Sequence, residues 1–236
     1  MDNLVIYQFS DGIATLTMDD GKVNAISVAM LKALNAALDR AEADKAVVII
    51  TGRERTFSGG FDLKAFQRDP AEVLQMLEGG ARLSQRLLSF QQPVIAACNG
   101  HAIAMGVFLL LSTDVRVGVD QLARIQINEV QIGLTLPHFA IEVCRQRLAP
   151  AHVNLAALTA HPYTPQEAFA AGFLDELAPP DGLIDAARTQ AFRLAKLHGE
   201  AFPATKLRLR QPMLQALRQA IERDLAEWNA RLLNRS

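Results

Sequence analysis

The chain has 236 residues, of which 50% are hydrophobic and 21% are charged, and this is enough apolar material for one domain with a large core. A formal net charge of −1 gives no electrostatic reason to expect binding to nucleic acid or to an anionic membrane. The two cysteines, Cys98 and Cys144, exclude a disulfide framework and a cysteine metal cluster, and we expect no metal site.

The N-terminal part of the chain predicts a hairpin followed by a helix. Asp11-Gly12 is a turn signal between two runs that we predict to be paired strands, Val5–Phe9 and Ile13–Met18. A helical pattern then extends over residues 27–43, and Ser27 is a suitable N-cap for it.

Three continuous apolar runs follow, and they predict strands that are buried on both faces. These strands are Val47–Thr51, Val94–Cys98 and Val115–Val119. Helical patterns lie between them at Pro70–Ser89 and Gly106–Ser112, although Gly79-Gly80 weakens the middle of the first. This β–α–β order predicts an α/β fold.

After about residue 137 the pattern becomes helical. Thr164-Pro165-Gln166-Glu167 is a capping-box signature, and Gly172 suits the position just after that helix. Pro203 and Pro212 punctuate the last helices. An apolar stripe over residues 214–228 predicts either intramolecular core or a subunit interface. We expect an α/β core over residues 1–195 and a helical region over residues 196–236.

No segment of the sequence has the composition of a targeting or membrane-spanning segment. The N-terminus lacks the basic region and long apolar stretch of a signal peptide. The longest apolar run, Ala102–Leu111, is too short to span a bilayer. We therefore expect a cytoplasmic protein that does not enter the membrane.

Three segments point to a chemical function. Thr56–Leu63 and Asn99–Gly106 each follow an apolar run and enter a helical pattern, so each can present free backbone N–H groups. Two such groups that converge on one point would form an oxyanion hole. Ile127–Gly133 adds one carboxylate, Glu129, as a base for proton transfer. This combination indicates enolate chemistry on a thioester.

These segments resemble the crotonase superfamily, the enoyl-CoA hydratase/isomerase family, over nearly the whole chain. The motifs that carry the resemblance are Phe57-Ser58-Gly59-Gly60-Phe61-Asp62-Leu63-Lys64, Asn99-Gly100-His101-Ala102-Ile103-Ala104-Met105-Gly106, Lys22-Val23-Asn24-Ala25-Ile26-Ser27 and Ala170-Ala171-Gly172-Phe173-Leu174-Asp175. The resemblance implies a spiral of β–β–α turns with a C-terminal helical trimerisation region, and therefore a homotrimer or hexamer. It also implies an acyl-CoA substrate and no cofactor beyond the coenzyme A that the substrate carries.

The resemblance also implies roles for individual residues. The backbone N–H groups of Phe61 and Met105 would form the oxyanion hole, and Glu129 would be the catalytic carboxylate. Ala104 and Met105 replace two glycines of the family pattern, which is costly only where φ is positive. The residues implied in substrate binding are Lys22, Val23, Gly59, Gly60, Asp62, Leu63, Gly106, Phe108 and His138.

Three of these residues also have an ordinary structural interpretation. Asp62 can cap a helix instead of contacting a ligand. His138 can be a loop histidine instead of a wall of the acyl pocket. Lys22 can be a solvated surface charge instead of a contact to a CoA phosphate.

The acid/base positions separate activities within the family. Its hydratases carry two glutamates, and the first of these positions is Phe108 here, which can neither transfer a proton nor hold water. Glu129 retains the second. This pattern resembles the Δ3,Δ2-enoyl-CoA isomerases, in which one base removes a proton from C2 and returns it at C4. We predict that reaction, with burial near Phe108 raising the pKa of Glu129.

Three alternatives remain open from the sequence. One is a hydratase with an unusual base arrangement, and another is a different enolate reaction such as C–C cleavage or decarboxylation. The third is a non-catalytic acyl-CoA-binding protein, which the loss of one family glutamate suggests and the retained Glu129 opposes.

Overall fold

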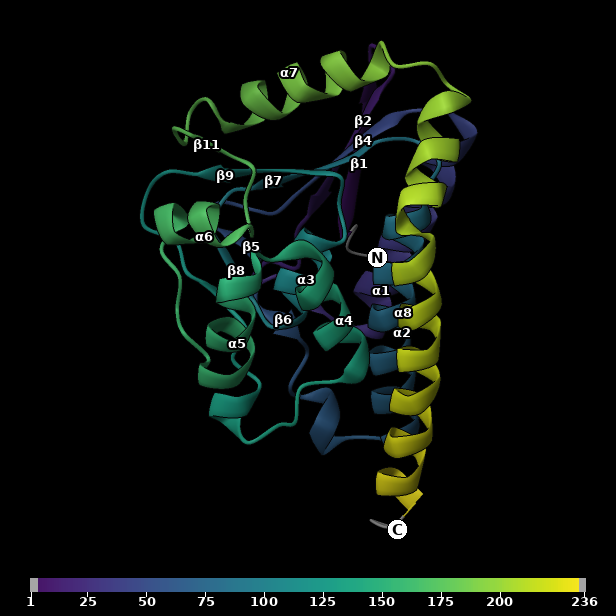
Figure 1. Ribbon diagram of the computed structural model, residues 1–236, viewed down its shortest axis with the longest axis vertical. Helices are drawn as coiled ribbons and strands as arrows, with labels where there is room; N and C mark the ends of the chain where they lie inside the picture. Colours follow the sequence, from purple (N-terminus) through teal and green to yellow (C-terminus); the bar gives the residue numbers. More distant parts are fainter. Residues whose placement is uncertain (1–3, 234–236) are drawn as a thin grey trace.

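The computed structural model describes residues 4–233 as an α/β fold built on a six-stranded sheet (Figure 1). The strand order is β1-β2-β4-β7-β9-β11, with β1 antiparallel to β2 and all other neighbours parallel. These strands are β1 Val5–Ser10, β2 Ile13–Met18, β4 Val47–Thr51, β7 Val94–Cys98, β9 Val115–Val119 and β11 Glu176–Ala178. The predicted α/β class is confirmed.

The inner strands β4 and β7 are buried along their whole length. Successive side chains along a strand point to opposite sides, so both faces of the sheet are covered there. In β4, Val48 and Ile50 belong to the larger hydrophobic cluster, whereas Val47 and Ile49 pack in a second cluster with α7 (Leu183–Ala195). Figure 1 shows α7 lying across the upper side of the sheet. The continuous apolar runs of the sequence therefore mark strands that are covered on both sides.

Two small parallel sheets carry the glycine-containing segments. One has the order β10-β8-β5 and the other pairs β3 with β6. Their strands are β3 Ala25–Ile26, β5 Thr56–Ser58, β6 Gly60–Phe61, β8 His101–Ile103 and β10 Ile125–Gln126. These strands are short, so they position loops and do not form a separate core.

The helices α1, α2, α3 and α6 begin and end close to the residues that the sequence predicted. The helices are α1 Val28–Ala43, η1 Ala65–Gln67, α2 Pro70–Ser89, α3 Met105–Leu111, η2 Val130–Ile132, α4 His138–Arg147, α5 Pro150–Thr159, α6 Pro165–Ala171, α7 Leu183–Ala195 and α8 Ala201–Leu233. Ser27 caps α1, Thr164 and Glu167 form a capping box on α6, and Gly172 ends α6 with φ of 88°. These cap predictions are confirmed.

The C-terminal helix α8 corrects one expectation and shows where its apolar stripe packs. It continues through Pro212, and Pro203 falls in its first turn, where a missing N–H costs no helical bond. Its apolar stripe, with Leu214 and Ile221 buried, packs against α2 and α4 of the same chain, so these residues belong to the intramolecular core. Figure 1 shows α8 running alongside α2. This packing offsets the cost of Pro212.

Two further details differ from the sequence-based expectations. β11 is a strand inside the region that was expected to be helical, and it is held by parallel pairing with β9. α2 is continuous through Gly79-Gly80, so the glycine pair does not divide it. No helix within residues 4–233 is long and apolar enough to cross a membrane.

Candidate active site

A cavity of about 500 Å³ lies where α2, α3, α4 and α8 meet the loops around β6 and η2. This volume is in the range of small-molecule sites, and most of the wall is apolar, as is usual for such sites. Its polar lining residues are Asn128, Glu129, Thr135 and Arg231. Its apolar lining residues include Phe61, Leu63, Phe66, Val73, Leu77, Phe108, Ile132, Leu134, Phe139 and Trp228.

The two glycine-containing segments meet at this cavity. Gly60 has φ of 92°, and a methyl group on its Cα would lie 2.9 Å from Cβ of Ala104 and 3.4 Å from the nitrogen of Met105. On the other side, a methyl group on Gly106 would lie 2.6 Å from the carbonyl oxygen of Ser58. Glycine at both positions therefore lets the two backbones come into direct contact.

The backbone N–H of Phe61 does not bond to β3, and that of Met105 has no acceptor within α3. The N–H of Asp62 donates to the carbonyl of Ile26 on β3 at 3.3 Å. Because successive N–H groups along a strand point to opposite sides, the N–H of Phe61 points away from β3. Met105 is the first residue of α3, so its N–H has no acceptor within the helix.

Ala104 adopts a conformation that favours glycine. Its φ is 50° and its ψ is −122°, so alanine at this family glycine position costs conformational energy. Strain of this type costs on the order of 1–3 kcal/mol. The conformation is held by the N–H of Ala104, which donates to Gln126 at 2.9 Å, and by its carbonyl, which accepts from Val107 at 2.8 Å.

Glu129 is a buried carboxylate in the cavity wall. It is 8% exposed, it immediately precedes η2, and its Oε2 atom has no hydrogen-bond partner among the described residues. Burial raises the pKa of Glu129 from its ordinary 4.5 to about 7, against a smaller lowering by its own backbone N–H. Glu129 is therefore not a solvated surface carboxylate.

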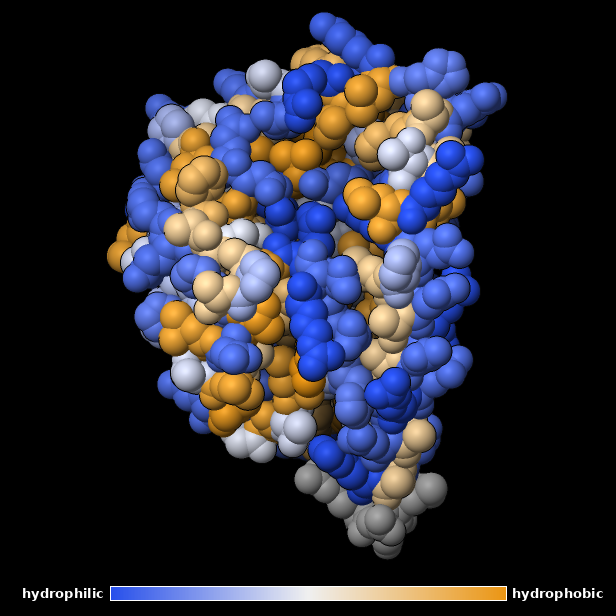
Figure 2. All heavy atoms as spheres, viewed as in Figure 1, coloured by the Kyte–Doolittle hydropathy of each residue, from blue (hydrophilic) through white to orange (hydrophobic). Residues whose placement is uncertain are grey.

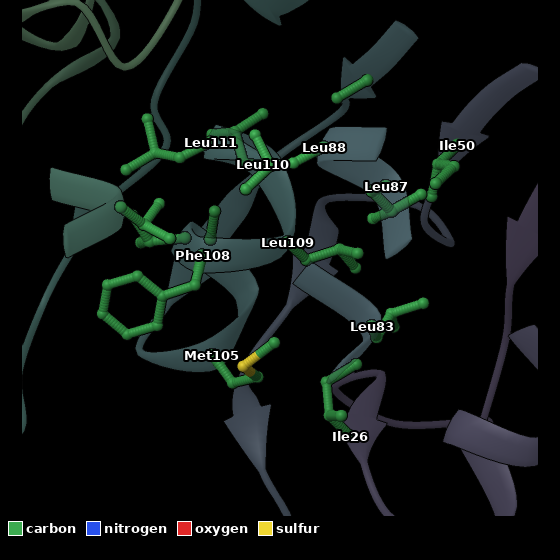
Figure 3. Packing of buried hydrophobic residues seen from close by; sticks show 14 of the residues in the cluster. Ile26, Ile50, Leu83, Leu87, Leu88, Met105, Phe108, Leu109, Leu110 and Leu111 are labelled. Carbon is green, nitrogen blue, oxygen red and sulfur yellow. The ribbon is translucent and has the colours of Figure 1, made fainter. Parts of the chain in front are cut away.

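Phe108 fills the wall with an apolar ring. It projects from α3 on the side opposite to Leu109, which packs toward Leu83 of α2 (Figure 3). The rings of Phe108 and Phe139 have centroids 5.7 Å apart at 73°, an edge-to-face pair. Both rings line the same cavity as Glu129.

The predicted site residues divide into those that line the cavity and those that do not. Besides Phe61, Phe108 and Glu129, the cavity is lined by Gly59 and Leu63. Gly60 and Gly106 bring the segments together without forming its wall.

Four other predicted binding residues, and the predicted donor Met105, also lie outside the cavity wall. Asp62 accepts from the N–H of Lys64 at 3.1 Å and pairs with Arg68, so its side chain holds the turn that leads into η1. The imidazole of His138 contacts Glu227 of α8 at 3.0 Å. Two others, Lys22 and Val23, are exposed, and the carbonyl of Val23 accepts from Gly59 at 2.7 Å.

The structure adds residues that the sequence motifs did not single out for the site. Asn24 is fully buried and donates from Nδ2 to the carbonyls of Thr56 and Phe57 at 3.1 and 3.2 Å, which fixes the segment leading to Phe61. Trp228 and Arg231 reach the cavity from α8, about a hundred residues beyond Glu129. Asn24 was visible within its motif, whereas no local signal could connect α8 to the cavity.

No three His, Cys, Asp or Glu side chains come together as a candidate metal site in the described part of the chain. Glu129 is the one carboxylate among the described residues that line the cavity. The chemistry available there is therefore proton transfer by a single carboxyl group.

A comparison with protein families matches residues 8–231 to enoyl-CoA hydratase/isomerase. The chain belongs to the enoyl-CoA hydratase/isomerase family. A Thermus thermophilus relative named as an enoyl-CoA hydratase is 33% identical over 205 residues, which are 84% of this chain and 78% of that protein. The carnitinyl-CoA dehydratase of Salmonella arizonae is 32% identical over 197 residues, covering 82% and 75%. The resemblance seen in the sequence is confirmed.

Solved structures of this family share the whole fold. One named as an enoyl-CoA isomerase of Mycobacterium tuberculosis is 45% identical with a TM-score of 0.92, covering 96% of this chain and 100% of that one. The human mitochondrial Δ3-Δ2-enoyl-CoA isomerase is 24% identical with a TM-score of 0.91, covering 97% and 92%, which shows the shared fold alone.

Proposed function

We propose that this family member is a Δ3,Δ2-enoyl-CoA isomerase that uses Glu129 as its single acid/base group. The observation that carries the proposal is the cavity wall, in which Glu129 is the one carboxylate among the described residues and Phe108 supplies an apolar ring. A reaction that adds no water and moves one proton matches this composition. Coenzyme A would enter as part of the substrate, with no separate cofactor.

The proposed reaction has two proton transfers. The thioester carbonyl of a 3-enoyl-CoA accepts hydrogen bonds from the N–H groups of Phe61 and Met105. Ionised Glu129 removes a proton from C2, and the electron pair passes into a dienolate, whose oxygen the two donors stabilise. The protonated Glu129 then returns the proton at C4, which gives the conjugated 2-enoyl-CoA and restores the carboxylate.

The raised pKa of Glu129 supports this role. A base with a pKa of about 7 can accept a proton near neutral pH and release it again in the same turnover. A carboxyl at its ordinary value would be a weaker base toward C2.

The Phe108–Phe139 pair supports isomerisation over hydration. Each ring is 1% exposed, and together they occupy the part of the cavity wall where hydration would need a second carboxylate and a water molecule. Water excluded from this wall cannot add to the conjugated product.

Hydration is the second candidate, because relatives named as hydratases match most of this chain. A second structure of the Mycobacterium tuberculosis protein that one structure names as an isomerase is named as a probable hydratase, with 44% identity and a TM-score of 0.93. In this candidate Glu129 would act on a water molecule in place of a second carboxylate. The two activities give different products, so they separate in one assay.

The test is turnover of 3-hexenoyl-CoA and 2-hexenoyl-CoA in deuterated water, resolved by mass and NMR. We expect conversion of the 3-enoyl thioester to the 2-enoyl thioester with no 3-hydroxyacyl product, and a loss of at least about 100-fold in Glu129→Gln. Glu222→Gln, on the exposed side of α8, is the control and should retain activity. A 3-hydroxyacyl product would support the hydratase, and thioester binding without turnover would support another enolate reaction or a binding protein.

A further inference from the structure

One glycine in the middle of α2 lies against both segments of the proposed oxyanion hole. A methyl group on Cα of Gly80 would lie 2.6 Å from Cζ and 2.7 Å from Cε1 of Phe61. The same methyl group would lie 3.2 Å from Sδ of Met105. No close-packed interior accommodates carbon contacts as short as the first two without movement.

The Met105 side chain reaches Gly80 from the start of α3. Figure 3 shows it extending toward the side of Leu83 and Ile26, and Leu83 follows Gly80 by one turn of α2. Phe61 approaches from β6, which is only two residues long and pairs with Ile26 of β3. Side chains from two separate segments, Phe61 and Met105, therefore pack against Gly80.

We propose that Gly80 is a positioning residue, which sets the spacing of the Phe61 and Met105 N–H groups through the side chains of those residues. The inference rests on the proposed function, because it assigns Gly80 to the same oxyanion hole. A methyl group at Gly80 displaces the Phe61 ring, and a strand of two residues has little pairing with which to resist that displacement. The shift reaches the N–H of Phe61, where small errors in geometry are costly.

The chain supplies a matched control in the preceding residue. A methyl group on Gly79 would lie 2.8 Å from Cδ1 of Leu31, the far end of a flexible side chain on α1. Gly79→Ala and Gly80→Ala are the same substitution at adjacent positions of one helix, and both raise helix propensity. Only Gly80 contacts the site, so a difference between the variants reports on the contact.

The experiment compares kcat and KM for 3-hexenoyl-CoA in the wild type, Gly79→Ala and Gly80→Ala, together with their thermal midpoints. In Gly80→Ala we expect kcat to fall about 10- to 100-fold with KM within about threefold, as for an interaction made mainly in the transition state. In Gly79→Ala both constants should stay within about threefold of the wild type. An equal loss of kcat in the two variants would overturn the inference, as would an unchanged kcat in Gly80→Ala.

A double-substitution cycle identifies the side chain through which Gly80 acts. Phe61→Leu removes the two ring atoms that approach Gly80 most closely and keeps the backbone N–H. In the Phe61→Leu background, Gly80→Ala should change kcat by less than about threefold, because the shorter side chain leaves room for the methyl group. A loss as large as in the wild-type background would show that Gly80 does not act through Phe61, and would overturn the inference.

A second readout is independent of isomerase activity. Acetoacetyl-CoA forms an enolate with its own near-ultraviolet absorbance, so the enolate band of the bound probe reports the oxyanion hole directly. We expect a band in the wild type and in Gly79→Ala, and at least a tenfold weaker enolate equilibrium in Gly80→Ala. A wild-type band without isomerisation would reject the proposed function and leave the Gly80 inference supported by the difference between variants. No band in the wild type would overturn both.

Discussion

Two residues at the site have local conformations or surroundings that cost folding free energy. Ala104 keeps a positive φ that glycine would adopt more readily, and Glu129 is a carboxylate buried without a partner for Oε2 among the described residues. Both lie where the two glycine-containing segments and η2 reach one cavity. Local strain and desolvation at a functional site are held by the surrounding structure, which includes the bonds that Ala104 makes to Gln126 and Val107.

The raised pKa of Glu129 predicts how stability depends on pH. The folded state favours the protonated carboxyl of Glu129. The contribution of this group to the free energy of unfolding is therefore fully present below pH 4.5 and is lost as pH rises through about 7. Glutamine at position 129 cannot ionise, so the free energy of unfolding of Glu129→Gln should exceed that of the wild type by about 3 kcal/mol at pH 8. Urea denaturation at pH 5 and pH 8 measures it, and an equal difference at both values would contradict the assignment.

At the scale of elements, α8 closes the cavity and also caps a neighbouring helix. The carboxylate of Asp224 on α8 accepts from the N–H groups of His138 and Phe139 at 2.8 and 2.9 Å, at the start of α4. Trp228 follows on the same helix and lines the cavity together with Phe139. The contact between α8 and α4 therefore holds one wall of the site.

Removal of the Asp224 carboxylate should weaken both stability and substrate binding. Asp224→Ala leaves two N–H groups at the start of α4, of which that of Phe139 is buried, without their acceptor. We expect this to cost about 1–3 kcal/mol of unfolding free energy. KM for 3-hexenoyl-CoA should rise as the wall between Phe139 and Trp228 loosens. Chemical denaturation and steady-state kinetics test this, with Glu222→Ala as the exposed control on α8. An unchanged free energy of unfolding would show that the Asp224 cap contributes little to stability.

At the scale of the whole molecule, α8 is tied to the core and an apolar face is left open elsewhere. Asp114, just before β9, pairs with Lys206 at 2.8 Å and with Arg210 at 2.9 Å, which anchors the first half of α8. On another side, Leu158 of α5 is 66% exposed and lines a surface hollow with Val130. Figure 2 shows apolar residues gathered over α5.

We propose that copies of this chain associate as a homotrimer, or as a hexamer, through the face around Leu158. An exposed apolar patch of this kind is typical of an interaction surface. Leu158→Glu should lower the mass in solution from that of an assembly toward the 25.8 kDa of one chain. Leu209→Glu is the control, since Leu209 is 79% exposed on α8. Light scattering measures the mass, and a monomeric wild type would reject the proposal.

The sequence alone predicted the features that depend on residues close together in the chain. The strand Val47–Thr51, the helix Pro70–Ser89 and the caps at Ser27 and Thr164 were all predictable, because periodicity and capping act within a few residues. The motifs predicted the family, and the family comparison confirms it. β11 escaped prediction, because a strand of three residues is held by its partner β9 and not by its own pattern.

Only the tertiary structure decided what surrounds the reactive groups. The burial of Glu129, the positive φ of Ala104 and the contact of Gly80 with Phe61 depend on segments that are distant in sequence. The same holds for α8, whose apolar stripe packs on α2 and α4 of the same chain. Desolvation and close packing are properties of neighbours in space, so a local pattern can name the residues of a site without describing their environment.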